Sequence, residues 1–428
     1  MESISLQMPV NRRYEVIVCG GGPAGCTAAA AAAREGKKTL LIEGTGALGG
    51  MGTMGLVPCW CPFSDGEKIL YRSLAETVFM RLRARIPEIS GTGLDWIPID
   101  AEQLKIVYDE LLAEHGADVL FDTHVCAVQC EGGKITRLIT NGRGGMTAFE
   151  SDVFIDCTGD AAVAAYAGAE MLEPGPVQPA THCFVITNIN GTEYARVGKI
   201  SGVRKDSPVY EILADGKYPD ITDAHFCVSH IGPNTLGFNA GHIVADATDP
   251  VEMSRAYAEG RKKAQVFLEA LKEYRSDIFK DAYVVQTAPL MGIRQSRRVK
   301  GDYVLTADDF VERRTFEDEI ARNCYYLDIH GGRAAGVPEK YLDRNLKPGE
   351  SHGIPYRCLT PAGMKNLLVA GRPISCDNYV QGSIRVMPPC LCTGEAAGVA
   401  AALCEGDVHQ VDVPLLREKL RNYGAYFL

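Results

Sequence analysis

The stretch that most restricts the fold of this chain is a glycine-rich turn between an apolar run and an alanine-rich run. Residues 14–20 read YEVIVCG, and their β-branched side chains predict a short buried strand. Residues 26–36 read CTAAAAAAREG, which predicts a helix ending at Gly36, because alanine has the highest helix propensity. The turn between them fits G-x-G-x-x-G, a pattern that binds a dinucleotide pyrophosphate at a helix N-terminus. The residues expected at the pyrophosphate are Gly20, Gly22, Pro23, Ala24 and Gly25.

The chain continues into a second predicted strand, residues 37–44, which ends in an acid. Glu43 stands 18 residues after Gly25, where a fold of this kind places the carboxylate that accepts hydrogen bonds from a ribose diol. A phosphate on the 2′ oxygen of that ribose would be repelled. The pattern therefore predicts a dinucleotide-binding site and disfavours NADP.

A second glycine-rich loop, residues 44–57, bears on the choice between NAD and FAD. A simple NAD-binding unit has no need of this loop, whereas its backbone can lie along the diphosphate and ribityl chain of FAD. A flexible surface loop is the alternative. No second G-x-G-x-x-G unit for a nicotinamide is found in the sequence. Within the loop, the residues expected to contact FAD are Gly44, Gly49, Gly50, Met51 and Thr53.

Later segments are expected to return to the same nucleotide. Residues 152–170 read as a strand, a Thr-Gly turn and a helix, and residues 365–372 read as another buried strand followed by a helix from about Pro389. A helix N-terminus directed at the flavin ring stabilises negative charge on its reduced form. The backbone of Val125 is expected beside the adenine. The other positions expected at FAD are Thr158, Gly159, Gly371, Arg372, Ser383, Ile384 and Arg385.

These stretches, taken in order, resemble the FAD-dependent oxidoreductases that have a glutathione-reductase-type flavin fold and a fumarate-reductase-like layout. The resemblance rests on CGGGPAGCTAA (19–29), GIRQSRRV (292–299) and GSIRVMP…GEAAGVAAAL (382–403), among others. It implies a non-covalently bound FAD. It implies no particular substrate, since that family is chemically diverse. The flavin-site positions that it carries over are Gly20, Gly22, Gly25, Glu43, Gly49, Gly50, Gly371 and Arg385.

We accordingly predict an α/β fold with a Rossmann-like FAD-binding domain of the glutathione-reductase type and an inserted α+β substrate domain. The FAD-binding domain comprises residues 1–180 and 355–428, and the inserted domain comprises residues 181–354. Inside the insertion, residues 181–194 and 224–244 predict strands of a second sheet. Residues 249–274 predict a long amphipathic helix that begins at Asp249 and Pro250.

The composition argues against several classes of partner. The net charge of −10 over 428 residues disfavours nucleic acid, because phosphate binding requires a basic face. The 15 cysteines are odd in number and irregularly spaced, which argues against a secreted disulfide framework. The sequence contains neither a signal-peptide pattern nor an apolar run long enough for a membrane span. We therefore predict a cytoplasmic protein that does not contact membranes.

The cysteine spacing does not predict a metal site. Cys59 with Cys61, and Cys390 with Cys392, have C-x-C spacing, whereas zinc knuckles and reductase dithiols use C-x-x-C. A cysteinyl flavin at Cys59 or Cys61 stays open as an alternative to non-covalent FAD.

Candidate catalytic residues come from two segments. Residues 291–306 are rich in basic side chains, and on a strand Arg294 and Arg298 would share a face, where two guanidinium groups suit a carboxylate or a hydroxylated substrate. A salt-bridged strand is the alternative. His330 suits proton transfer near neutral pH. The candidate catalytic residues are thus His330, Arg294, Arg298 and Tyr326, with Tyr325, His352, Tyr356 and Arg357 as further candidates for the same cleft.

The sequence therefore predicts an FAD-dependent oxidoreductase that transfers a hydride between a small polar, hydroxylated organic substrate and flavin N5. A CH–CH oxidoreductase like fumarate reductase, an NAD-dependent dehydrogenase and a flavin-binding subunit without turnover are the alternatives. The substrate, the direction of the reaction, the electron donor or acceptor and the oligomeric state, including a homo-oligomer, stay open.

Overall fold

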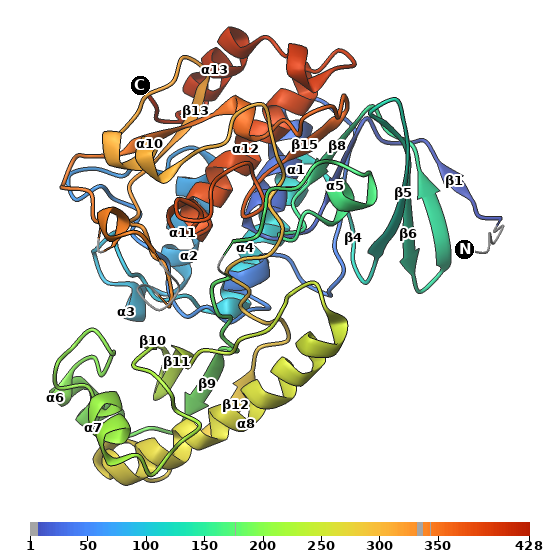
Figure 1. Ribbon diagram of the computed structural model, residues 1–428. Coiled ribbons are helices and arrows are strands. Elements are labelled where there is room, and N and C mark those ends of the chain that lie inside the picture. The colour runs from blue at the N-terminus through green and yellow to red at the C-terminus, as the bar shows by residue number, and fades with distance from the viewer. Residues whose placement is uncertain (1–6, 176, 332–336, 343) are drawn as a thin grey trace.

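The computed structural model describes residues 7–175, 177–331, 337–342 and 344–428, which form a larger and a smaller unit (Figure 1). The larger unit is built on a five-stranded parallel sheet with the strand order β15-β8-β2-β3-β4. Four of these strands are fully buried, as expected where both faces of a parallel sheet are covered. In sheet order the strands are Leu367–Val369, Val153–Asp156, Val16–Cys19, Thr39–Ile42 and Asp118–Leu120. The predicted strands near both ends of the chain are therefore confirmed as members of one sheet.

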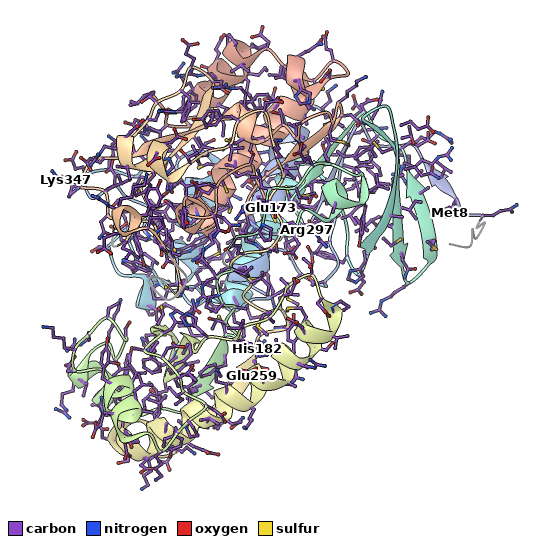
Figure 2. All side chains as sticks on the ribbon, viewed as in Figure 1. Met8, Glu173, His182, Glu259, Arg297 and Lys347 are labelled. Carbon is purple, nitrogen blue, oxygen red and sulfur yellow. The ribbon has the colours of Figure 1, made fainter. Side chains whose placement is uncertain are left out.

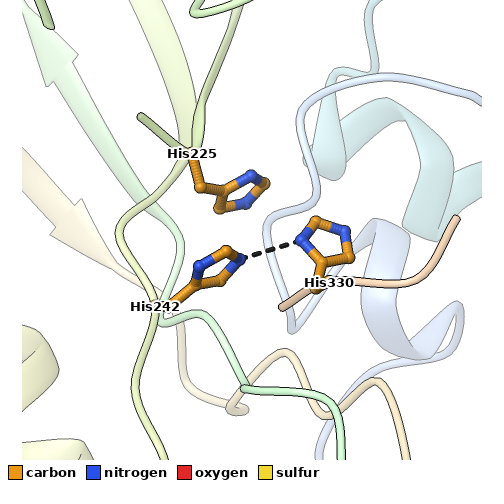
Figure 3. Close-up of side chains that lie close together, drawn as sticks. All are labelled: His225, His242 and His330. Atoms are coloured by element: carbon orange, nitrogen blue, oxygen red, sulfur yellow. Dashed lines mark hydrogen bonds between the residues drawn. The ribbon is translucent and has the colours of Figure 1, made fainter. Parts of the chain in front are cut away.

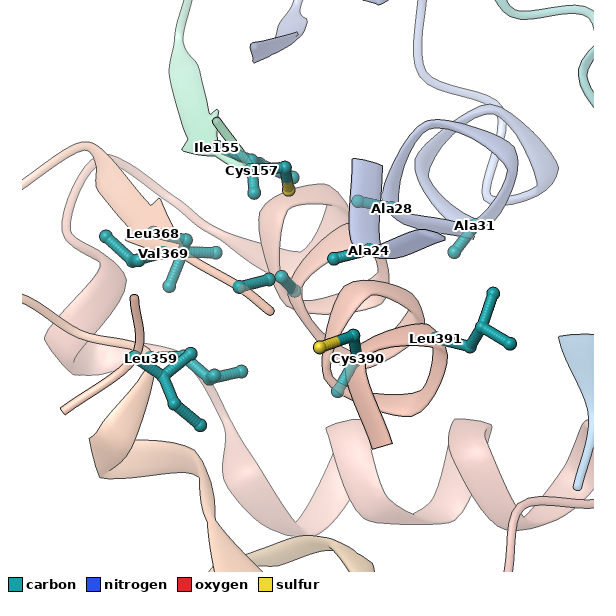
Figure 4. Close-up of a cluster of buried hydrophobic side chains, with 14 of the residues drawn as sticks. Ala24, Ala28, Ala31, Ile155, Cys157, Leu359, Leu368, Val369, Cys390 and Leu391 are labelled. Atoms are coloured by element: carbon teal, nitrogen blue, oxygen red, sulfur yellow. The ribbon is translucent and has the colours of Figure 1, made fainter. Parts of the chain in front are cut away.

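Two helices from opposite ends of the chain pack against each other beside this sheet (Figure 4). They are α1 (Pro23–Arg34) and α12 (Met387–Leu403). A Cβ atom on Gly394 of α12 would lie 2.1 Å from the backbone oxygen of Ala24 in α1, so glycine is required at this crossing. The predicted C-terminal helix is confirmed but begins at Met387 rather than Pro389, because prolines are tolerated in the first turn of a helix.

An antiparallel hairpin lies beside the parallel sheet. Its strands are β5 (His124–Glu131) and β6 (Lys134–Gly142), and the turn between them consists of Gly132 and Gly133, both with positive φ. The predicted hairpin is therefore confirmed, and glycine is favoured in its turn because other residues rarely adopt this backbone conformation. Strands β7 (Gly145–Phe149) and β1 (Val10–Asn11) complete the order β1-β7-β6-β5.

The smaller unit has its own sheet and its own core. Its strand order is β10-β11-β9-β12, and all of its strand pairs are antiparallel. The strands are, in that order, Phe226–Gly232, Thr235–Ala240, Phe184–Thr187 and Tyr283–Thr287. Phe184, Phe226 and Phe238 pack with Phe267 in this core, which extends from Phe184 to Val284 in the sequence.

The long helix α8 (Pro250–Tyr274) covers this sheet. The Asp249 side chain accepts hydrogen bonds from the first backbone N–H groups of α8, which confirms the predicted cap. His182 lies against α8, where a Cβ on Gly260 would come within 2.4 Å of it, and Figure 2 labels it close to Glu259. The shorter helices of this unit are α6 (Gly191–Val197), α7 (Pro208–Asp215) and α9 (Ser276–Phe279).

The chain returns to the core of the larger unit at Val299. There it forms a two-stranded antiparallel sheet of β13 (Glu319–Asn323) and β14 (His352–Pro355). No helix in the described part of the chain is long and apolar enough to cross a membrane. The remaining helices of the larger unit are α2 (Leu74–Arg85), α3 (Pro87–Ser90), α4 (Ala101–His115), α5 (Ala162–Tyr166), α10 (Ala307–Glu312), α11 (Gln381–Ile384) and α13 (Val413–Asn422).

Candidate active site

A cavity of about 1140 Å³ lies between the two units, with walls supplied by both. One end is formed by the glycine-rich segments of the larger unit, and the other end is closed by residues of the smaller unit and of the chain after β13. The cavity brings together most of the residues that the sequence assigns to FAD. Those that line it are Gly20, Gly22, Pro23, Ala24, Glu43, Gly44, Gly50, Met51, Val125, Thr158, Gly159, Gly371, Arg372 and Arg385.

The turn between β2 and α1 has the geometry that a diphosphate requires. A Cβ on Gly25 would lie 1.7 Å from the Gly20 oxygen, so the strand and the helix can meet this closely because this residue is glycine. A Cβ on Gly22 would meet no heavy atom of the described residues within 4 Å, and that open side belongs to the cavity. Gly22 is also the N-cap of α1 and has no side chain to bond the first N–H groups. These groups can therefore donate to a phosphate, and the turn fits FAD.

Glu43 is held rigidly at the end of β3. Its Oε2 accepts a hydrogen bond of 2.6 Å from the Gly21 N–H, and its Oε1 accepts from both the N–H and the hydroxyl of Thr45 at 2.7 Å. The carboxylate lines the cavity, so its remaining acceptor positions suit a ribose diol.

Five of the residues assigned to FAD lie behind the cavity wall. Gly25 packs on Gly20, as described above, and the Thr53 hydroxyl donates to the Leu48 oxygen at 2.6 Å. The Ser383 hydroxyl accepts from Asn323 and donates to the Tyr325 oxygen. These contacts brace the loops that form the wall. The five residues are Gly25, Gly49, Thr53, Ser383 and Ile384.

Arg294 reaches the far end of the cavity. One terminal nitrogen donates to the Pro179 oxygen at 2.6 Å and to the Thr181 hydroxyl at 2.9 Å. The other lies 2.9 Å from Nε2 of His225 and 3.4 Å from Oδ1 of Asn239. Burial lowers the pKa of this guanidinium to about 10, so it stays charged at neutral pH.

Arg298 does not share a face with Arg294. Residues 291–306 are described throughout and form isolated bridges instead of the strand that the sequence predicted, so side chains do not alternate regularly along them. The Arg298 guanidinium donates to Oδ1 of Asn378 at 2.8 Å and to the Glu173 oxygen at 2.6 Å, outside the cavity lining. The prediction of two guanidinium groups on one strand face is therefore wrong.

His330 and Asp328 stand opposite the glycine-rich loops. His330 Nε2 lies 3.3 Å from Asp328 Oδ1, and Asp328 Oδ2 accepts from Arg385 at 3.0 Å. Burial, with the nearby Arg294 charge, lowers the pKa of His330 to about 4. Burial opposes ionisation of Asp328, but His330, Arg385 and Arg294 together hold its pKa well below the usual range. The wall thus presents a neutral imidazole and an ionised carboxylate at pH 7.

Tyr326 and both cysteines of the first C-x-C pair also line the cavity. Burial raises the pKa of Tyr326 to about 12, so its hydroxyl stays protonated. The Sγ atom of Cys59 lies 4.0 Å from the Sγ atom of Cys227 in β10, and no C-x-C spacing predicts this pair.

Three further candidates lie away from the cavity. His352 is buried against Asn323, the Tyr356 hydroxyl donates to the Val408 oxygen at 2.8 Å, and Arg357 pairs with Asp318. Their expected place in the cleft is therefore wrong, because each side chain is engaged within the larger unit.

The structure adds site residues that the sequence reasoning missed. His225, directly before β10, and Asn239 of β11 reach the cavity from one hairpin, and Asp328 reaches it from the chain after β13. A histidine directly before a predicted buried strand, as in AHFCV, was the available signal for His225. The other two residues carry no local pattern.

The fold and the cavity define a class, that of dinucleotide-binding proteins in which a cavity extends from the glycine-rich turn to a second unit. The chain belongs to the family of FAD dependent oxidoreductases, whose sequence pattern matches residues 15–420. The protein is accordingly an oxidoreductase, and its cofactor is FAD.

Two solved structures align with nearly the whole of this chain. One is a geranylgeranyl bacteriochlorophyll reductase-like protein from Thermoplasma acidophilum, with 16% identity and a TM-score of 0.47 over 97% of this chain and 83% of that chain. Another is L-proline dehydrogenase from P. horikoshii, with 13% identity and a TM-score of 0.43 over 96% of this chain and 99% of that chain.

Proposed function

We propose that this protein oxidises, or forms by reduction, a C–OH group of a small polar substrate held between the two units. FAD, when bound, exchanges a hydride with the substrate carbon through flavin N5. The chain itself positions the substrate, excludes water and handles the hydroxyl proton. His330 accepts or returns that proton, Arg294 and the Tyr326 hydroxyl donate hydrogen bonds to the substrate, and Asp328 orients His330.

The proposal rests on the hydrogen bonds that the two guanidinium groups at the cavity wall already make. Arg294 already donates to neutral acceptors through both terminal nitrogens, and Arg385 is paired with Asp328. A dicarboxylate of the fumarate type would have to replace several of these contacts at once, whereas a single hydroxyl oxygen would replace one of them and its O–H could donate to a neutral histidine. We therefore favour C–OH over CH–CH chemistry.

The glutathione-reductase type of the FAD domain and the division into residues 1–180 with 355–428 and an inserted domain 181–354 are part of the proposal. The separate core of the smaller unit supports an insertion, although side chains from Val299 onward pack into the larger core. Non-covalent FAD, a cytoplasmic location and an unidentified electron donor or acceptor complete the proposal.

The test is anaerobic mixing of the FAD-loaded protein with polyols, sugars, 2-hydroxy acids and succinate, monitored by the flavin band near ~450 nm. We expect a hydroxylated compound to bleach this band. Bleaching by succinate alone would establish the CH–CH alternative, and an unchanged band with every compound would favour a subunit without turnover.

Variants then test the assigned roles. Arg294→Gln should retain FAD and slow bleaching by roughly 100-fold, since a hydrogen bond from a charged donor contributes about 1.5–3 kcal/mol. Arg297→Gln is the matched control, because Arg297 is a neighbouring arginine that does not line the cavity and donates to the backbone oxygen of Asp160 at 3.5 Å. Equal rates in the parent and Arg294→Gln would remove Arg294 from the mechanism.

A further inference from the structure

Three histidines from distant parts of the chain meet at one wall of the cavity (Figure 3). His225 precedes β10, His242 follows β11, and His330 follows β13. His242 Nε2 lies 2.8 Å from His330 Nδ1, within hydrogen-bond distance. The rings of His225 and His242 are stacked, with centroids 4.5 Å apart and an interplanar angle of 2°.

This arrangement suits proton transfer better than a metal ion. The ligand atoms of the three rings lie within 4.8 Å of one another, but an imidazole binds a metal in the plane of its ring. The stacked, parallel planes of His225 and His242 do not meet at a common point. In addition, a guanidinium nitrogen of Arg294 lies 2.9 Å from His225 Nε2 and would repel a cation there.

The hydrogen-bonded pair continues outward to a carboxylate. His242 Nδ1 lies 3.1 Å from Oδ2 of Asp223, whose side chain is 30% exposed. The other oxygen of Asp223 accepts from the His225 backbone N–H at 2.8 Å, which fixes the carboxylate. His330 lines the cavity, while His242 and Asp223 lie behind it. The groups therefore form a path from the chamber wall to a partly exposed acid.

The charge of Asp223 determines which ring nitrogen donates in the contacts between Asp223 and His242 and between His242 and His330. Burial opposes ionisation of Asp223, yet the bond to His242 holds its pKa well below the usual range, so Asp223 is an acceptor. His242 then donates from Nδ1 to Asp223 and accepts at Nε2 from Nδ1 of His330. The ionised Asp328 competes for a proton on His330 Nε2, but its Oδ1 lies further away, at 3.3 Å, than Asp223 Oδ2 lies from His242 Nδ1, at 3.1 Å. We therefore place the His330 proton on Nδ1, which leaves Nε2 as a proton acceptor beside the Asp328 carboxylate.

We propose that His330, His242 and Asp223 form a proton relay that carries the substrate hydroxyl proton away from the chamber. The inference rests on the proposed C–OH chemistry. The hydride pair leaves the substrate carbon for FAD, and the O–H proton passes to His330 Nε2. The Nδ1 proton of His330 moves to His242 Nε2, and the positive charge comes to rest on His242 beside ionised Asp223. The substrate loses two electrons and two hydrogens, and reduction runs the same steps in reverse.

Other charged groups face this path and set its direction. Arg294, Arg385 and Asp328 surround His330. The two positive guanidinium groups outweigh the one carboxylate, so a positive charge on the His330 ring is disfavoured. His242 faces the neutral His225 ring, and the Lys263 ammonium donates to its backbone oxygen at 2.8 Å. Burial and Arg294 lower the pKa of His225, which keeps that ring uncharged. The charge is therefore stabilised at the Asp223 end of the path.

The first test needs no substrate. In FAD-loaded protein labelled with ¹⁵N-histidine, long-range ¹H–¹⁵N spectra distinguish the protonated and bare ring nitrogens, and His242→Gln and His330→Gln assign the signals. At neutral pH we expect the proton of His330 on Nδ1 and a bare Nε2. A proton on Nε2 of His330, or a metal bound at one equivalent in the purified protein, would overturn the relay.

Asp223→Asn tests the outer end, because it removes the charge and keeps the shape. The His330 proton should move from Nδ1 to Nε2, since Asp328 is then the ionised carboxylate left beside the two rings. Asp220→Asn is the matched control, since Asp220 is an acid nearby in sequence that pairs with exposed Lys262. A His330 proton that stays on Nδ1 in Asp223→Asn would contradict the proposal. If Asp223→Asn does not fold, His242→Leu, which offers no acceptor to His330 Nδ1, must move the proton to Nε2.

A compound that bleaches the flavin adds a kinetic readout. The bleaching rate at neutral pH should fall by roughly tenfold or more in Asp223→Asn, because the proton loses its final acceptor, and the rate of Asp220→Asn should match the parent. Equal rates for all three proteins would exclude a catalytic use of the relay. If no compound bleaches the flavin, the proposed function fails, while the spectra still decide whether the relay exists.

Discussion

The Sγ atom of Cys59 lies 4.0 Å from the Sγ atom of Cys227, so a thiol of the larger unit faces a thiol of the smaller unit's sheet. Both residues line the cavity. The hydrogen bond from Cys227 lowers the pKa of Cys59, and the same bond raises the pKa of Cys227. Cys59 is therefore the partner that forms a thiolate first.

We predict that a mild thiol oxidant such as diamide joins these two residues. A disulfide needs an S–S distance of about 2 Å, so a small side-chain movement suffices. Peptide mapping under non-reducing conditions should give a Cys59–Cys227 peptide in the parent and none in Cys227→Ser. Cys126→Ser is the control, because Cys126 is exposed on β5, away from the pair. A dominant Cys59–Cys61 product would contradict this prediction.

A second prediction concerns the contact between strand and helix at the phosphate loop. Gly25→Ala places a methyl group 1.7 Å from the Gly20 oxygen, so β2 and α1 must separate and the loop must change shape. We expect at least a tenfold loss of FAD affinity, which corresponds to about 1.4 kcal/mol, measured by fluorescence titration of the apoprotein.

The matched control for that change is Gly46→Ala. Gly46 lies in the neighbouring glycine-rich loop, and a Cβ there would meet no heavy atom of the described chain within 4 Å. Its FAD affinity should equal that of the parent. Equal affinities in all three proteins would mean that the close approach of Gly20 and Gly25 has no role in binding.

The local parts of the fold were predictable from the sequence. The turn from Gly20 to Gly25, the hairpin at Gly132 and the Asp249 cap each depend on residues within one short segment. The far end of the site was not predictable in this way. His225 and His242 become neighbours because β10 and β11 pair with Phe226 opposite Ala240 and the Gly241 N–H bonds the His225 oxygen at 2.8 Å. Such a register depends on long-range pairing that no single segment encodes.

The error at Arg298 has a related cause. In a regular strand, side chains alternate between the two faces, so Arg294 and Arg298 would share a face. The segment instead forms isolated bridges to separate partners: Gly292 pairs with Thr181, and Val299 pairs with Met171. Residues 293–298, between these bridges, belong to no strand, and the two guanidinium groups bind different parts of the chain.

The ion pair of Asp328 and Arg385 leads to a third prediction. Asp328→Asn removes a negative charge from the chamber and leaves the Arg385 guanidinium without its carboxylate. The more positive surroundings should stabilise electrons on FAD and raise its midpoint potential by roughly 30 mV, which for a two-electron couple is about 1.4 kcal/mol. Spectroelectrochemical titration measures this shift. Asp318→Asn, which alters a pair with Arg357 outside the cavity lining, should leave the potential unchanged.

An unaltered or lower potential in Asp328→Asn would contradict the third prediction. It would mean that the carboxylate does not influence the flavin ring, and that Arg385 acts on another part of the chamber.

The last prediction concerns pH and a histidine outside the site. His352 is buried in β14, with its Nδ1 facing the Gly353 oxygen at 3.1 Å and its Nε2 facing the Asn323 amide at 3.0 Å. These contacts require a neutral ring that donates from Nδ1 and accepts at Nε2, and burial accordingly lowers the pKa of His352 to about 4. In the unfolded chain a histidine has a pKa of about 6.5.

Unfolded protein therefore binds a proton at residue 352 between pH 6.5 and pH 4 that folded protein does not bind, and acidification through this window favours unfolding. From pH 7 to pH 5, His352 alone should reduce the free energy of unfolding by about 2 kcal/mol. Urea titrations at both pH values measure the loss, and His352→Gln, which cannot titrate, should lose about 2 kcal/mol less than the parent. The pKa of His330 is also lowered in the folded protein, and its effect on the free energy of unfolding is the same in the parent and in His352→Gln. An identical loss in parent and variant would mean that the ring is already protonated in the folded state, against the hydrogen bonds that it makes.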